Sequence, residues 1–568
     1  MLQERIDAAA GRRKAALVLK NGRYVNVFTG EICRGDIAVE DGVIVGTGEY
    51  AGEREIDIGG KIAVPGLIDA HVHIESSQLS PGHFAQLVVP HGTTCAVADP
   101  HEIANVCGLG GVEYLAASAA ATPLEVKMML PSCVPATAFE TSGARITGKD
   151  TEAAIATARY WGLGEFMNYP GVLNKDAEAL CKLAAARRAG KIVDGHAPAA
   201  TGKGLNAYIA AGISTDHESE GPAEAAEKAA KGMYVHLREG SAARNVAANC
   251  KAVTAANFRR FLFCTDDRHA ADLQEGGHID NALRVAVAAG MDPVRAVTCA
   301  TLNAAECYGL RGKGAVAPGY DADIAVFDDL RSFRCAMAVK GGRVVAEGGK
   351  ALFSSSEELP ACVRGTVHVE APSPEKFRLN VRSGRARVIG IGAGSLVTEC
   401  EVRAVQSRGD DVALQGTDLL KLAVVERHRG TGNIGLGLLA GYGLHGGAIG
   451  LTVAHDSHNI IVLGDNNEDM AAVTAELARI GGGMAVCGGG RTDSLPLDIA
   501  GLMSSLPAEE FIARQSALCA RAREMGVRPG FDPFMSLSFL ALPVIPHLKL
   551  TDRGLFDVDK FCFVPVEA

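Results

Sequence analysis

The spacing of apolar residues along the chain changes near residue 65 and again after residue 310. Before residue 65, short apolar runs such as ALVLKNGRYVNV and DIAVEDGVIVGTG contain Asn-Gly and Asp-Gly dipeptides. These dipeptides adopt the backbone of tight two-residue turns, so the pattern predicts β-hairpins. A similar pattern returns in GAVAPGYDADIAVFDDL and AMAVKGGRVVAEGG. We therefore expect residues 1–64 and 311–353 to form one small composite β-domain, because domain termini usually lie close together.

Between these two segments, short apolar strands alternate with alanine-rich helical stretches, and each strand ends in a polar cluster. The eight predicted strands begin at Leu67, Thr93, Val126, Leu163, Ile192, Ile213, Tyr234 and Phe261. Repeated strand-helix units predict a parallel sheet, and eight of them predict a (β/α)8 barrel of the TIM type. Two helices, over residues 279–290 and 293–310, complete the expected barrel at residues 65–310. The expected fold class is therefore α/β.

The rest of the chain is predicted to form a separate domain. Residues 354–374 are polar and contain prolines, which is typical of a linker. Residues 375–568 mix strand and helix patterns without an internal repeat, so we expect an additional α+β C-terminal domain there.

Composition and charge narrow the class of ligand. The chain has 568 residues, of which 48% are hydrophobic and 21% charged, which is enough for several packed domains. Its net charge of −10 disfavours a nucleic-acid or anionic-membrane partner, since those partners attract clustered Lys and Arg. No stretch approaches the roughly 18 apolar residues of a membrane span. We therefore expect a cytoplasmic protein that acts on a small molecule.

The first strand of the expected barrel ends in two histidines, His71 and His73. Alternate side chains of an extended strand share one face about 6.5 Å apart, so both rings can converge on one metal ion. Active sites of TIM barrels lie at the C-terminal ends of the strands. The metal-competent side chains at these ends are His71, His73, Glu165, His196, His217 and Asp266. A single histidine after a strand is more often a loop or core residue, but six such groups at matched positions predict a site.

Four imidazoles and two carboxylates suit a pair of divalent transition ions with one bridging carboxylate. Two ions lower the pKa of a shared water, which makes hydroxide available at neutral pH. Asp266 follows the eighth strand, where it can accept a proton from that water and pass it to a leaving group.

Five segments, PGLIDAHVHIESS, GLGEFMN, DGHAP, TDHES and CTDDRH, together resemble the adenine deaminases of the amidohydrolase superfamily, in this order and over essentially the whole chain. The resemblance implies hydrolysis of adenine to hypoxanthine and ammonia, a step of purine salvage. It also implies two divalent ions, with manganese or iron preferred and zinc compatible. By resemblance, one ion is held by His71, His73 and Asp266, the other by His196 and His217, and Glu165 bridges them. Many relatives bridge with a carboxylated lysine instead, so Glu165 disfavours hydantoinase or dihydroorotase activity.

The acid that protonates the purine ring is less defined. Related deaminases carry a glutamate three residues after the strand-five histidine, where this chain has Ala199. Our order of preference for the acid is Glu102, then Glu239, then Glu218, although each alone is also compatible with a solvated or loop-ordering charge. The residues that we expect to contact the substrate are Asp99, His101 and Arg238. His101 and Glu102 are also compatible with a further ion.

Two patterns stand out in the C-terminal part. Residues 430–435 fit the pattern GxGxxG, and Asp456 follows about 20 residues later. A dinucleotide site would need a strand directly before these glycines and a helix directly after them, and the sequence pattern predicts neither. His455, Asp456 and His458 form a polar cluster that fits a loop ordered by hydrogen bonds better than a metal site. We expect this domain to cover the barrel mouth or to help a subunit interface.

Two alternatives remain at this point. The chain could be another amidohydrolase, such as a guanine or cytosine deaminase or a cyclic amidase. It could also be a barrel that has lost catalysis and serves as a scaffold, because fold alone does not fix function. The expected assembly is a homodimer or another homo-oligomer.

Overall fold

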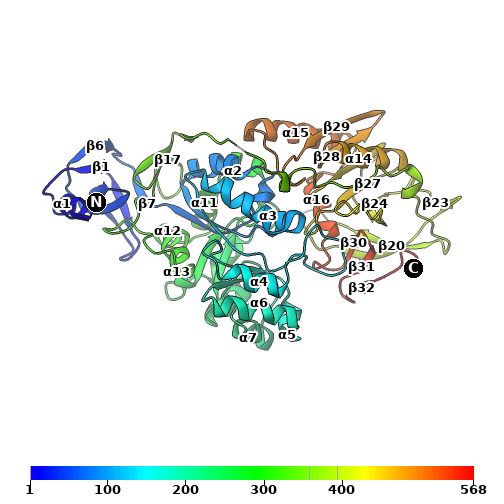
Figure 1. Cartoon of the computed structure of the whole chain (residues 1–568), viewed down its shortest axis with the longest axis horizontal. Coiled ribbons are helices and arrows are strands. Elements are labelled where there is room, and N and C mark those ends of the chain that lie inside the picture. Colours follow the sequence, from blue (N-terminus) through cyan, green and yellow to red (C-terminus); the bar gives the residue numbers. More distant parts are fainter. Residues whose placement is uncertain (1, 357, 393–394) are drawn as a thin grey trace.

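The computed structural model describes residues 2–356, 358–392 and 395–568, and it shows an α/β fold. We call residues 2–64 and 311–353 the flanking region, residues 65–310 the central region and residues 375–568 the C-terminal region. Figure 1 shows the flanking region at one end of the molecule and the C-terminal region at the other, with the central region between them.

Eight parallel strands run through the central region. They are β8 (Leu67–Val72), β9 (Thr93–Ala98), β10 (Glu125–Met128), β11 (Gly162–Phe166), β12 (Ile192–Gly195), β13 (Thr215–Asp216), β14 (Tyr234–Arg238) and β15 (Phe261–Cys264). Five begin at the expected residue, and β10, β11 and β13 begin within two residues of it. Hydrogen bonds join them as β8-β9-β10, β11-β12 and β13-β14-β15. Parallel bridges between Leu130 and Leu163, and between Val72 and Asp266, link β10 to β11 and the end of β15 to β8.

Helices follow the strands along the chain and pack outside them. The longer ones are α2 (Pro81–Val88), α3 (His101–Ala120), α4 (Gly148–Ile155), α6 (Ala177–Arg188), α7 (Gly202–Ala210), α8 (Pro222–Ala230), α10 (Ala270–Gly276) and α11 (Ile279–Ala288). Among the described helices, only α3 is long and apolar enough to cross a membrane, which corrects the expectation that no segment has this composition. Half of its most apolar window is buried inside the protein.

The two halves of the flanking region share one sheet and a buried core. A seven-stranded sheet runs in the order β19 (Lys350–Ala351), β18 (Arg343–Glu347), β17 (Cys335–Lys340), β16 (Ile324–Phe327), β7 (Ile62–Pro65), β2 (Arg23–Asn26) and β3 (Glu31–Arg34). A second sheet holds β5 (Val43–Gly48), β4 (Asp36–Glu40), β1 (Ala15–Lys20) and β6 (Gly52–Asp57). Leu17 and Ile37 pack in one buried cluster with Ile324 and Val339. Since β7 leads directly into β8, this sheet holds the start of the strand that carries His71.

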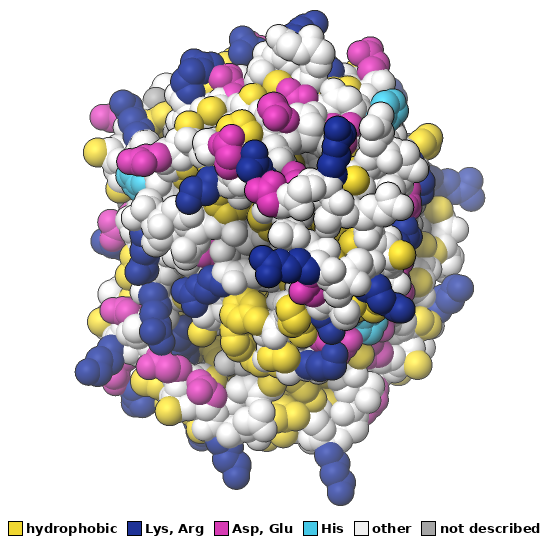
Figure 2. All heavy atoms as spheres, turned by 90° about the vertical axis from the view of Figure 1, so that its right-hand side faces the viewer, with side chains coloured by type: hydrophobic (Ala, Val, Ile, Leu, Met, Phe, Trp, Pro, Cys, Tyr) yellow, Lys and Arg dark blue, Asp and Glu magenta, His cyan; other side chains and the backbone are white. Residues whose placement is uncertain are grey.

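An eight-stranded sheet forms the centre of the C-terminal region. Its order is β21 (Glu399–Ala404), β20 (Arg385–Gly390), β25 (Ile434–Ala440), β24 (Leu419–Val425), β27 (Ile460–Gly464), β26 (Gly447–Leu451), β28 (Gly483–Gly488) and β29 (Arg491–Pro496). α14 (Asn467–Arg479) and α15 (Ala508–Glu524) pack against it, and β30 (Leu548–Thr551), β31 (Gly554–Asp557) and β32 (Cys562–Phe563) form a small sheet. Figure 2 views this end of the molecule and shows hydrophobic side chains gathered in the lower half of the face. Phe561 and Phe563 are exposed large hydrophobic residues of this region.

The C-terminal region is packed firmly against the central region. Phe84 of α2 and Ile103 of α3 belong to the same buried cluster as Leu422 and Phe511 of the C-terminal region. The expected linker, residues 354–374, contains no strand or α-helix among its described residues. It is nevertheless fixed in place, because Val363 is fully buried and the backbone N–H of His368 donates to the carbonyl of Arg427 at 2.7 Å.

The GxGxxG segment is a hairpin loop between β24 and β25. A dinucleotide fingerprint needs a helix after its glycines, whereas strand β25 begins at Ile434. The carboxylate of Glu426 accepts hydrogen bonds from the backbone N–H groups of Arg429 at 2.7 Å and Thr431 at 2.9 Å.

Candidate metal centre

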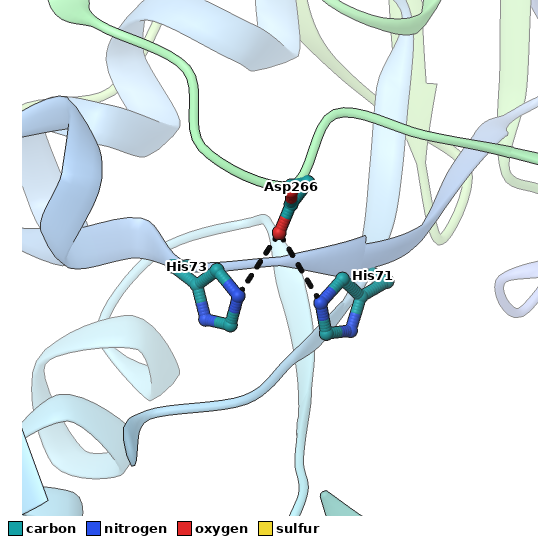
Figure 3. A group of neighbouring side chains, drawn as sticks. All are labelled: His71, His73 and Asp266. Atoms are coloured by element: carbon teal, nitrogen blue, oxygen red, sulfur yellow. Dashed lines mark ion pairs between the residues drawn. The ribbon is translucent and has the colours of Figure 1, made fainter. Parts of the chain in front are cut away.

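Strands β8 and β15 bring His71, His73 and Asp266 together (Figure 3). Nε2 of His71 lies 3.4 Å from Oδ1 of Asp266, and Nε2 of His73 lies 3.0 Å from the same atom. The backbone N–H of Asp266 donates to the carbonyl of His71 at 3.0 Å, which fixes the two strand ends against each other. Asp266 has a left-handed backbone (φ +57°), a conformation that Asp and Asn tolerate better than most residues.

Glu165, at the end of β11, lies between two groups of imidazoles. Its Oε1 is 3.2 Å from Nε2 of His73, and its Oε2 is 2.7 Å from Nδ1 of His196 and 3.4 Å from Nε2 of His217. Each carboxylate oxygen therefore faces a different group of histidines, as a bridging ligand would. The backbone N–H of Glu165 donates to Oδ2 of Asp99 at 2.7 Å, so Asp99 orients the strand end.

The charges of this cluster match a cation. Burial by itself raises the pKa of Glu165, but His196, His217 and His73 hold that pKa well below its usual range. Burial also raises the pKa of Asp266, but Arg238 and His71 lower it by more, so that it lies well below its usual range. Both groups are therefore carboxylates. The ring nitrogens of His71 are buried and make no hydrogen bond with the described residues, as expected of an imidazole that ligates an ion. The residues present thus fit a divalent metal pair.

Strand β14 adds two groups to this region. Arg238 donates to Oδ2 of Asp266 at 2.6 Å and also pairs with the carboxylate of Glu218. His236 is fully buried, and its ring centroid lies 6.4 Å from that of His71. The sequence analysis missed His236. Alternate residues of a strand share a face, so the choice of Arg238 as a site residue also indicated His236, two positions before it.

A cavity of about 230 Å³ opens onto these side chains. From the central region it is lined by His73, His101, Glu102, Glu165, His196, His217, Glu218, Arg238 and Asp266, among others. The C-terminal region closes it with Leu396, Phe539, Leu542, Ile545 and Pro546. Glu239 and Asp99 are not among its lining residues. A larger cavity of about 450 Å³ holds none of the six expected ligands.

Glu102, at the start of α3, contacts two histidines of the C-terminal region. Nδ1 of His455 lies 2.7 Å from Oε1, and Nε2 of His458 contacts Oε2 of the same carboxylate. Both histidines lie in the loop between β26 and β27, residues 452–459. Burial raises the pKa of Glu102, but His455 and His458 hold it well below its usual range. The sequence analysis singled out all three residues but did not link Glu102 to the two histidines.

A buried ion pair supports the strand ends that carry His196 and His217. Lys228 of α8 donates to Oδ2 of Asp216 at 2.7 Å and to the carbonyl of Ala197 at 2.8 Å, and both charged side chains are fully buried. Oδ1 of Asp216 accepts from the backbone N–H of Ala197 at 2.9 Å. Asp216 precedes one expected ligand and Ala197 follows the other, so this pair sets the distance between the two histidines.

Replacing Lys228 with methionine is expected to destabilise the protein by about 3–5 kcal/mol, because Asp216 is left as a buried, uncompensated charge. A fall in the thermal unfolding midpoint measured by calorimetry checks this. Lys231→Met is the control on the same helix, since the partly exposed Lys231–Glu227 pair contributes about 1 kcal/mol or less. Equal midpoints for the two variants would contradict the role given to Lys228.

Comparison with known proteins places the whole chain in one group. The model described as amidohydrolase family matches residues 62–345, and the model described as adenine deaminase C-terminal domain matches residues 395–562. The chain is 50% identical over 568 residues to an adenine deaminase of Nitratidesulfovibrio vulgaris (strain Hildenborough), covering 100% of this chain and 99% of that protein. It is 46% identical to adenine deaminases of Clostridium acetobutylicum (99% of this chain, 100% of that protein) and Geobacillus kaustophilus (100% and 99%).

Proposed function

The chain belongs to the adenine deaminases of the amidohydrolase family, and on that premise we propose which of its residues carry out the reaction. The protein is a hydrolase that converts adenine and water to hypoxanthine and ammonia. In this reaction, water adds to C6 of the purine, one of its protons goes to ring N1, and the other leaves with the amino group. The residues must therefore activate water and move two protons.

We propose a pair of divalent ions at the cluster around Glu165. His71, His73 and Asp266 hold one ion, His196 and His217 hold the other, and Glu165 bridges them. The support is the convergence of the four imidazoles on the two oxygens of Glu165, together with the contacts of Asp266 to His71 and His73. Imidazole and carboxylate donors without cysteine suit manganese or iron, and zinc is also compatible. When bound, such a pair lowers the pKa of a shared water.

Asp266 is the proposed proton shuttle between the attacking water and the departing amino group. Its Oδ2 is held by Arg238 at 2.6 Å, while Oδ1 faces His73. This contact orients the carboxylate towards the cavity and keeps it ionised, so that it can accept a proton. Transfer of that proton to the amino nitrogen releases ammonia.

Of the three acids considered for ring N1, Glu218 is the one we propose. Its Oε1 lies 3.5 Å from Nε2 of His217, and it lines the cavity beside Arg238. Glu102 ranked first on sequence grounds, but its two carboxylate oxygens contact His455 and His458 of the C-terminal region, whereas those of Glu218 contact Arg238, a proposed contact to the base. Glu239 does not line the cavity. Glu218 would carry one proton of water to N1, and His101 and Arg238 remain the proposed contacts to the base.

The size of the cavity supports a free base as substrate. About 230 Å³ is less than the roughly 300–1,000 Å³ typical of pockets for drug-sized ligands. A purine base is smaller than a nucleoside, which carries a ribose in addition. The apolar side chains of Phe539 and Leu542 offer a surface for a flat ring.

We also propose that the eight parallel strands form one (β/α)8 barrel, with the site at the C-terminal ends of the strands. The support is the order of strand pairing and the bridge between Val72 and Asp266. Residues 1–64 and 311–353 form the composite β-domain of this proposal, and residues 375–568 form the domain that closes the cavity.

Ammonia release from a panel of bases tests the proposed substrate. Full-length protein loaded with Mn²⁺ is expected to release ammonia from adenine and to act far more slowly on adenosine, because the cavity has room for a base without its ribose. Guanine and cytosine, the substrates of the alternative deaminases, are assayed in the same panel. Rates are measured at equal protein and metal concentration. Comparable rates on adenine and adenosine would contradict the argument from cavity size, and no release from adenine would contradict the function itself.

A further inference from the structure

A second group of metal-competent side chains lies outside the six proposed ligands. Glu102, His455 and His458 place one carboxylate and two imidazoles so that their donor atoms lie within 4.8 Å of one another. All three side chains are buried, with 2%, 7% and 1% of their surface exposed. Glu102 comes from the central region and the two histidines come from the C-terminal region, so folding of both regions is needed to form the cluster.

Asp456 provides an independent observation at the same place. Its side chain is 2% exposed, and its Oδ2 is buried without a hydrogen-bond partner among the described residues. Its other oxygen, Oδ1, lies 3.8 Å from Nδ1 of His455, the atom that faces Glu102. A buried carboxylate oxygen without a partner costs about 1–3 kcal/mol or more, so such an atom usually has a ligand, an ion or a water beside it.

We propose that Glu102, His455 and His458 bind a third divalent transition-metal ion, with Asp456 as a further ligand. This goes beyond the proposed function, which uses only the pair of ions at Glu165. Two imidazoles and one or two carboxylates are a donor set for Mn²⁺, Fe²⁺ or Zn²⁺. Two neutral imidazoles and two carboxylates carry a charge of about −2, which one such ion neutralises.

The position of this third site indicates a structural role beside the cavity. His101 separates it from the pair: its Nε2 lies 3.6 Å from Oε1 of Glu102, and its Nδ1 lies 3.4 Å from Oε1 of Glu165. An ion held by residues of both regions ties loop 452–459 to the first turn of α3. It thereby keeps His455 and Asp456 in the cavity wall, which both residues line.

Counting bound metal tests the proposal. Full-length protein is dialysed against Mn²⁺, desalted, and assayed for manganese per chain by mass spectrometry. The expected counts are three for the wild type and two for His458→Asn. The matched control is His428→Gln, because His428 contacts the carbonyl of Ser457 in the same loop at 2.7 Å but offers no ligand to the cluster. This control is expected to bind three ions.

Two results would overturn the third site: a count of two in the wild type, or the same count in the wild type and His458→Asn. If His458→Asn does not fold, diffraction at the manganese edge from wild-type crystals decides the matter. An anomalous peak between Glu102 and His458 supports the proposal, and no peak there overturns it. The count does not depend on turnover. A wild type with two ions and full deaminase activity would therefore reject the third site and leave the proposed function intact.

Discussion

Asp266→Asn is expected to lower kcat for ammonia release from adenine by about 10²–10⁴-fold, which is the usual contribution of a positioned proton-transfer group. The amide has the shape of the carboxylate but cannot accept a proton. Asparagine also tolerates the left-handed backbone of this position, so the strand end is expected to keep its conformation. The measurement is the initial rate of ammonia release at saturating adenine.

The metal dependence of this variant separates proton transfer from metal binding. Asp266 is proposed as both a ligand and a shuttle, so its replacement is assayed over a range of Mn²⁺ concentrations. A loss of rate that persists at saturating Mn²⁺ supports the shuttle, whereas recovery of the wild-type rate contradicts it. Asp272→Asn is the control, because Asp272 is a partly exposed residue of α10 that contacts Ser241 and Arg244. It is expected to keep the wild-type rate.

Glu165→Ala is expected to remove at least one equivalent of bound metal per chain and to abolish measurable turnover. Among the described ion pairs, its carboxylate is the only one that lies within 4 Å of all three of His73, His196 and His217, whereas Asp266 reaches only His73 and Glu218 only the other two. Without it, His71, His73, His196 and His217 lose the carboxylate that they share, and its negative charge no longer balances that of bound ions. Metal content by mass spectrometry and ammonia release are measured on the same preparation.

Glu220→Ala is the matched control for this substitution. It removes an exposed carboxylate that lines the same cavity, and it is expected to leave the metal count unchanged. Retention of the wild-type count in Glu165→Ala would contradict the bridge. Glu165 would then be an acid that orients the imidazoles without binding an ion.

The strand ends of the central region could be predicted from sequence because the pattern there is local. A short apolar strand followed by a polar cluster repeats eight times, and parallel strands end at one side of a sheet. This rule selected His71 and Asp266, which are 195 positions apart, and the structure brings them within 3.4 Å. Their ligation of ions stays a prediction.

The direction of individual side chains and contacts between regions could not be predicted in this way. Glu239 was preferred over Glu218 although successive residues of a strand point to opposite faces, and Arg238 already occupied the face towards the cavity. The contact between Glu102 and His458 joins residues that are 356 positions apart. No local pattern encodes it, since it depends on how the C-terminal region packs over the strand ends.

That separation also sets an order of events during synthesis. Chains grow at about 5–20 residues per second, and domains fold as they emerge, so about 20–70 s pass between the appearance of Glu102 and that of His458. Strand β7, which leads into β8, likewise cannot pair with β16 until β16 has been synthesised. The histidines that contact Glu165 are therefore all synthesised before His455 and His458, the partners of Glu102. The cluster around Glu165 can form during synthesis earlier than the cluster around Glu102.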